Sequence, residues 1–138
     1  MRRVPRATER VLTRGQAMVE LALAFPLLVL AALALVQFAL YVHAENVTIG
    51  AAQDGARVAA EVDRGVSDGV ATTQSLLQAG LGAEASFVAV QGTDDGTAVT
   101  ITASGSLPLI LPAVANASLP LHAQASVSKE RFVVGPNG

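Results

Sequence analysis

The chain has 138 residues, which allows one domain at most; 51% of the residues are apolar and 14% are charged. An ordinary soluble domain has about 25% charged residues, so this composition argues against one. The lack of cysteine excludes disulfides and zinc–thiolate sites.

The charge is divided unevenly along the chain. Residues 1–15 hold five arginines and one glutamate and form a basic leader. The rest of the chain holds four basic and ten acidic groups. Because this body is acidic and aromatic residues are scarce, the sequence predicts no binding to nucleic acid.

An apolar run follows the leader. Residues 21–42 contain a single strongly polar side chain, Gln37. As a helix the run would be about 33 Å long, which matches a hydrocarbon core of about 30 Å. Pro26 removes one backbone donor near its start, which a membrane helix tolerates. The run therefore predicts a transmembrane helix in contact with the lipid bilayer.

The charges on either side of this run predict its orientation. The basic leader precedes it and a net acidic stretch follows, so the positive-inside rule places residues 1–15 in the cytoplasm and the C-terminal part outside. A removable secretory signal is the alternative, since Val42-His43-Ala44 resembles a cleavage site. The apolar region of such signals is only about 7–15 residues long, which favours a retained span.

One carboxylate, Glu20, stands at the start of the run. In the first turn of the span, the positive end of the helix would favour it. If the chain were cut after Gly15, Gln16 would carry a new α-ammonium group four residues from Glu20, within reach on the same helix face. Glycine suits such a cut because it weakens helix and lets another backbone approach. The alternatives are a simple interfacial acid and a flexible hinge.

Two stretches carry a resemblance to a known family. Residues 14–21, RGQAMVEL, followed by Pro26, resemble the start of TadE-like pseudopilins of tight-adherence (Flp-type) pilus systems. Residues 51–60, AAQDGARVAA, resemble the AAxxGARxAA stretch that commonly follows the span in that family. Leu21 departs from the family, in which an aromatic residue is frequent at this position.

The resemblance implies a function and a site. A prepilin peptidase would cut after Gly15, Gln16 would become the mature N-terminus, and Glu20 would guide assembly. The chain would then be a minor pilin or pseudopilin-like subunit of the bacterial cell membrane, with other pilin subunits and the pilus assembly machinery as partners. Whether it enters the surface pilus stays open. The alternative is a membrane-anchored or secreted binding module that is not processed as a prepilin.

After the span the helix is expected to continue to residue 63. A stripe of mainly small side chains would let another backbone approach closely. It consists of Val47, Ala51, Gly55, Val58 and Val62. Either this face packs against other subunits, with Pro26, Gly55 and Arg57 as contacts, or it rests on the chain's own sheet with Arg57 in water. Ion pairs are expected along Asp54, Arg57 and Glu61.

Residues 64–138 predict a small extracytoplasmic domain. A break near Gly65 leads to a short helix over 69–80, capped by Ser67 or Asp68. Alternating patterns then predict strands over 85–91, 99–104 and 119–128, with a turn over 93–96. The expected fold is α+β and pilin-like: a long N-terminal transmembrane helix, a short second helix and an antiparallel sheet of about three strands.

The segment 106–121 is apolar but contains three prolines, so it is not a second span. Left exposed, it would mark a contact with a partner or a membrane. The favoured interpretation is a loop that closes over the sheet.

No catalytic motif occurs in the sequence. His43 is interpreted as an interface residue and His122 as part of the outward face of a strand. Asp94, Asp95 and Gly96 form a turn pattern that lacks the other ligands of a calcium loop. The sequence therefore predicts a protein that is not an enzyme and uses no metal or cofactor.

Overall fold

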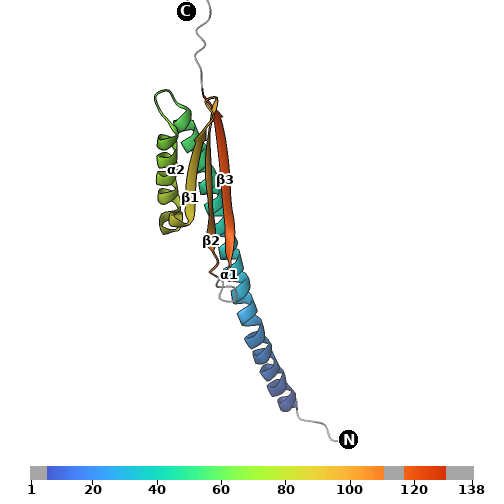
Figure 1. Ribbon diagram of the computed structural model, residues 1–138. Coiled ribbons are helices and arrows are strands. Elements are labelled where there is room, and N and C mark those ends of the chain that lie inside the picture. The colour runs from blue at the N-terminus through green and yellow to red at the C-terminus, as the bar shows by residue number, and fades with distance from the viewer. Residues whose placement is uncertain (1–5, 111–116, 130–138) are drawn as a thin grey trace, which may run out of the picture.

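The computed structural model describes residues 6–110 and 117–129, with side chains from residue 15 onward. Figure 1 shows one long helix whose C-terminal half carries a second helix and a three-stranded sheet. The elements are α1 (Arg6–Ala60), α2 (Val66–Leu81), the 3-10 helix η1 (Gly82–Phe87), β1 (Val88–Asp94), β2 (Ala98–Pro108) and β3 (Ser118–Ser128). The α+β prediction is confirmed.

Helix α1 is 55 residues long, about 80 Å at 1.5 Å per residue. Pro26 lies inside it without ending it. From Gly15 to Val36 the helix stands clear of the rest of the described chain, and its large apolar side chains are exposed. From Gln37 to its end, one face is covered by α2 and the sheet. One helix therefore supplies both a free apolar rod and part of a folded body.

The covered face of α1 is made of small side chains. Its small buried residues recur at helical spacing and are Ala44, Thr48, Ala51, Ala52, Gly55, Ala56 and Ala59, and the larger Gln37 is buried at the start of this face. Small side chains let a helix and a sheet both approach α1, and the main core joins three of these alanines to Val99, Ile101 and Ala123. Val62, the last residue of the predicted stripe, is 70% exposed because α1 ends at Ala60.

Helices α1 and α2 touch at a pair of glycines. A Cβ atom at Gly55 would lie 2.6 Å from the Gly69 carbonyl oxygen and closer still to Thr73 Oγ1. A Cβ atom at Gly69 would lie 2.6 Å from the Cβ of Ala59. The Thr73 hydroxyl is 2.8 Å from the Gly69 carbonyl and 3.2 Å from the Ala51 carbonyl, so its proton is shared between the two helices. Side chains larger than glycine do not fit this contact.

Helix α2 begins earlier than predicted, at Val66, with Gly65 as its N-cap. The Gly65 N–H donates to Asp68 Oδ2 at 3.1 Å, so Asp68 supports the helix start from its first turn. The helix starts three residues before the predicted residue 69 because Gly65, not Ser67 or Asp68, is its N-cap. The helix ends at Gly82, which has a φ of 61°.

The sheet has the order β1-β2-β3 with antiparallel neighbours throughout. Strand β1 starts three residues later than predicted because η1 occupies residues 82–87. Strand β2 runs beyond the predicted residue 104 to Pro108, opposite Ser118 of β3. His122 faces outward as predicted, with buried Leu121 and Ala123 on either side of it.

The segment that was expected to close over the sheet does not do so in its described parts. Residues 106–108 and 118–121 belong to strands β2 and β3. Leu109 donates its N–H to the Ala117 carbonyl at 3.0 Å, and Ile110 lies beside α1. This end of the sheet, near the α1 label in Figure 1, therefore lies where α1 leaves the body.

The turn between β1 and β2 is held by two aspartates. Asp95 Oδ1 accepts hydrogen bonds from the Thr97 hydroxyl, the Thr97 N–H and the Ala98 N–H at 2.7–2.8 Å. These bonds lower the pKa of Asp95 from 3.8 to about 2, with the Thr97 hydroxyl as the largest cause. A hydrogen bond from Lys129, followed by one from the Gly96 N–H, lowers the pKa of Asp94. Gly96 has a φ of 84°, so the predicted turn is confirmed.

We expect Gly55→Ala to lower the free energy of unfolding by about 1–3 kcal/mol, because the new methyl group forces α1 and α2 apart. Gly50→Ala is the matched control. Nothing lies within 4 Å of a Cβ atom at Gly50 in the same helix, so it should stabilise by about 0.5–1 kcal/mol. Denaturation of the full-length chain in detergent, followed by circular dichroism, measures both. Equal stabilities of the two variants would show that the helices do not meet at Gly55.

We expect the stabilising effect of the Asp95 carboxylate to depend on pH. Its pKa is depressed on folding, so the contribution is complete above about 3.8 and is lost as the pH falls towards about 2. The difference in melting temperature between the parent chain and Asp95→Ala should be constant from pH 7 to 5 and then shrink. A difference that stays flat down to pH 2 would contradict the assigned turn.

Candidate functional site on the N-terminal helix

The predicted processing and assembly residues lie together on the free part of α1. Gly15, Gln16 and Glu20 are exposed and line one shallow, open depression with Val19 and Leu23. Gln16 and Glu20 are one helical turn apart, as the predicted pairing requires. Within the described side chains, Glu20 has no hydrogen bond or ion pair. Its carboxylate is therefore available to a group outside this chain's fold.

Gly15 has no role in the chain's own fold. It lies inside α1 with helix on both sides, which contradicts the alternative of a flexible hinge before the helix. No atom lies within 4 Å of a Cβ atom placed on it, so alanine would fit as well. The choice of glycine here is not explained by contacts within the protein.

The helix that carries these residues is exposed and strongly apolar. Residues 15–60 include a window of mean hydropathy 2.5, none of which is buried within the described structure. The core helix of a soluble protein has a comparable composition but is buried, whereas here large side chains such as Phe25 and Leu35 are 62% and 71% exposed. The exposure indicates that α1 anchors the protein in a membrane.

The far end of the predicted span overlaps with the body. Gln37 Oε1 accepts the Ile110 N–H at 2.9 Å, and the Tyr41 hydroxyl donates to the Pro120 carbonyl at 3.3 Å. Nε2 of His43 lies 3.3 Å from the Gly80 carbonyl oxygen. Each of these side chains therefore contacts the backbone of the body. The interpretation of His43 as a membrane-interface residue stays a prediction, and the uncovered helix ends at Val36.

The alternative cleavage site lies inside the folded body. Ala44 is 1% exposed and sits in the middle of α1. A cut there would remove Gln37, Tyr41 and His43 together with their contacts to the body. The folded state therefore depends on residues that a secretory cleavage at this position would take away.

The three predicted subunit contacts have different surroundings. Pro26 and Arg57 are exposed, and Arg57 forms an ion pair with Asp54 at 3.3 Å. Gly55 lies inside the chain against α2. Its contact with another subunit stays a prediction. The expected ladder is incomplete: Glu61 pairs with Arg64 at 3.4 Å, because α1 ends before it.

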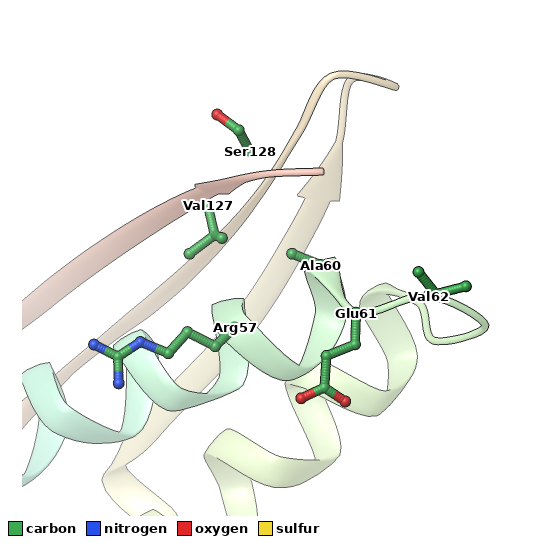
Figure 2. Close-up of a pocket in the computed structure, with 6 residues that line it drawn as sticks. All are labelled: Arg57, Ala60, Glu61, Val62, Val127 and Ser128. Atoms are coloured by element: carbon green, nitrogen blue, oxygen red, sulfur yellow. The ribbon is translucent and has the colours of Figure 1, made fainter. Parts of the chain in front are cut away.

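A groove of about 360 Å³ lies between the C-terminal end of α1 and the end of β3. Its lining residues are Arg57, Ala60, Glu61, Val62, Val127 and Ser128. Figure 2 shows Val127 pointing towards α1, while the charged ends of Arg57 and Glu61 point away from each other. Sequence reasoning missed this groove because residues 57–62 and 127–128 meet only after folding. Among the residues the structure describes, no cluster of three His, Cys, Asp or Glu side chains occurs that would hold a metal.

Comparison with protein families matches the segment in which these residues lie. The family model of TadE-like proteins matches residues 15–57. This segment is TadE-like. The match confirms the resemblance seen in the sequence and starts at Gly15. No curated protein and no solved structure matches the chain.

The TadE-like segment combines two structural roles. Up to Val36 it is the exposed apolar rod, and from Gln37 it includes nearly all of the small-residue face on which α2 and the sheet pack. The three strands lie outside the match. The family pattern therefore covers the anchor and the surface that receives the body.

Proposed function

We propose that this chain is a minor pilin or pseudopilin-like structural subunit that acts in the assembly of a tight-adherence-type pilus. The observation that carries the proposal is the position of Gly15, Gln16 and Glu20 on a stretch of α1 that the chain's own body leaves uncovered. The TadE-like match starts at the same glycine and supports this reading.

The proposed mechanism starts with a cut after Gly15 by a prepilin peptidase. The new ammonium group of Gln16 then lies one helical turn from Glu20 and neutralises it. An acidic side chain costs about 2.5–3.5 kcal/mol at the centre of a membrane helix, so a cationic partner favours keeping this acid at the membrane edge. In a bundle of subunits, the ammonium group of a neighbouring helix is the alternative partner.

The proposed topology follows from the charges around α1. The leader, residues 1–15, lies in the cytoplasm of a bacterial cell, and the body lies outside the membrane. The partners are other pilin subunits and the assembly machinery. The role proposed for this chain is structural, without catalysis and without a cofactor.

A membrane-anchored binding module that keeps its leader is the second candidate. The groove at the end of α1 favours it, because apolar Val62 and Val127 line it together with charged Arg57 and Glu61. The secreted form of this alternative is weakened by the burial of Ala44. The state of the N-terminus separates the two candidates.

We expect the chain from its native host to begin at Gln16. Mass spectrometry of membrane and pilus fractions, together with sequencing of the N-terminal peptide, measures this directly. The mass also reveals whether Gln16 keeps its free ammonium group or has cyclised. A membrane-bound chain that retains residues 1–15 would contradict processing and favour the anchored module. A soluble chain that starts near Glu45 would contradict both.

We expect Glu20→Ala and Glu20→Gln to reduce the amount of the chain that is cross-linked to pilus subunits by about tenfold or more, the equivalent of about 1.4 kcal/mol. Both variants remove the negative charge, and Glu20→Asp should restore part of the association. The matched control is Glu45→Gln, which removes an acid from the same helix within the body. Unchanged cross-linking of both neutral variants, at equal protein levels in the membrane, would refute the assembly role.

A further inference from the structure

Two fixed points on α1 limit how the protein sits in a membrane. Between Gly15 and Val36, the uncovered part of α1 whose side chains are described, Glu20 is the only acid, and Gln37 marks the start of the body. The helix is continuous between these positions, which are 17 residues apart, so they lie about 26 Å apart along its axis. This distance is shorter than a hydrocarbon core of about 30 Å, and any tilt of the helix shortens its span further.

The two ends therefore cannot both lie outside the hydrocarbon of an undeformed bilayer. If Glu20 stays at the inner surface, the level of Gln37 lies roughly 4 Å or more below the outer edge of the hydrocarbon. If the body stays in water, Glu20 is drawn inward by the same amount. The chemistry of the two ends decides which of them enters the lipid.

The body end at Gln37 is built from apolar groups. We define the sheet base as residues 108–110 and 117–120, together with Phe38 and Leu40 of α1. Ile110 is 51% exposed, Phe38 66% and Leu40 40%, and they continue the apolar surface of the free helix. Between residues 106 and 121 the sequence contains no charged side chain. This end carries no charged group among its described residues, so it requires less hydration than the Glu20 carboxylate does.

The described backbone of the sheet base also meets the condition for entering lipid. Non-helical backbone is tolerated at membrane depth where its polar groups are satisfied within the protein. The Leu109 N–H donates to the Ala117 carbonyl, and the Ile110 N–H donates to Gln37 Oε1. The Pro120 carbonyl accepts from the Tyr41 hydroxyl, and prolines at 108 and 120 have no N–H to satisfy. Gln37 Oε1 and the Tyr41 hydroxyl thus satisfy two backbone groups of this edge, whereas Gln37 Nε2 is buried without a hydrogen-bond partner among the described residues.

We propose that the sheet base dips into the outer leaflet of the bilayer and forms a second, shallow membrane contact beside the span. The proposal rests on α1 crossing the membrane and not on any role in a pilus. The occupant of this apolar surface is lipid, because the surface is continuous with the exposed apolar side chains of the anchor itself.

The absence of cysteine permits a direct measurement of depth. The full-length chain carrying Ile110→Cys, labelled with an environment-sensitive fluorophore, is reconstituted in phosphatidylcholine vesicles that contain lipids with a quencher on the upper acyl chain. We expect the lipid quencher to reduce the fluorescence at least about twofold, and the effect to grow in thicker bilayers and shrink in thinner ones. Phe38→Cys provides a second probe at the same level.

Two control positions make the outcome decisive. Gln124→Cys, an exposed site higher on β3, should stay accessible to a water-soluble quencher and insensitive to the lipid quencher. Val19→Cys reports the other end of the helix. A water-accessible probe at 110 together with a deeply placed probe at 19 would overturn the proposal, since Glu20 would then be the end that enters the lipid. A chain that fails to float with the vesicles would overturn the anchor as well.

Discussion

The whole structure depends on the small-residue face of α1. Alanines at 52, 56 and 59 supply one side of the main core, and Gly55 meets Gly69 where no larger side chain fits. The sheet and α2 bury few large side chains. The largest of their fully buried side chains are Leu77, Ile101 and Val99. The body thus has no complete core without the helix that also forms its anchor.

Because the anchor and the body share this helix, their positions in the membrane are coupled. Because α1 is one continuous helix, a change in the depth or tilt of its TadE-like end also moves the sheet. A movement of the sheet likewise moves that end of the helix. The contacts of Gln37, Tyr41 and His43 tie the lower part of the body to the helix just beyond the free rod. On the proposed function, a pull applied near Glu20 would move the body as one piece, without a linker to absorb it.

The sequence predicted the elements whose patterns are local. The apolar run, the turn at Asp95 and the alternation in β3 each follow from a few consecutive residues. The sequence did not predict whether the chain's own sheet or a second subunit covers the small-residue stripe. The answer depends on strands that lie far from the stripe in the sequence. For the same reason it did not predict that Gln37 marks the boundary of the body. Its partner, Ile110, is 73 positions away, and the groove beside Arg57 likewise joins the two ends of the fold.

The fold also limits where another subunit can bind. From Gln37 to Ala60, the side of α1 that has small residues is already occupied by the chain's own α2 and sheet. The exposed side of that stretch carries polar groups such as Asp54 and Arg57. Among the described residues, most of the exposed large apolar side chains lie on the free rod, which has Glu20 at its edge. On the proposed function, an assembly contact that uses helix packing is therefore expected within the bilayer. There a carboxylate that needs a cationic partner would set the register between neighbouring helices more strongly than the surrounding leucines and alanines.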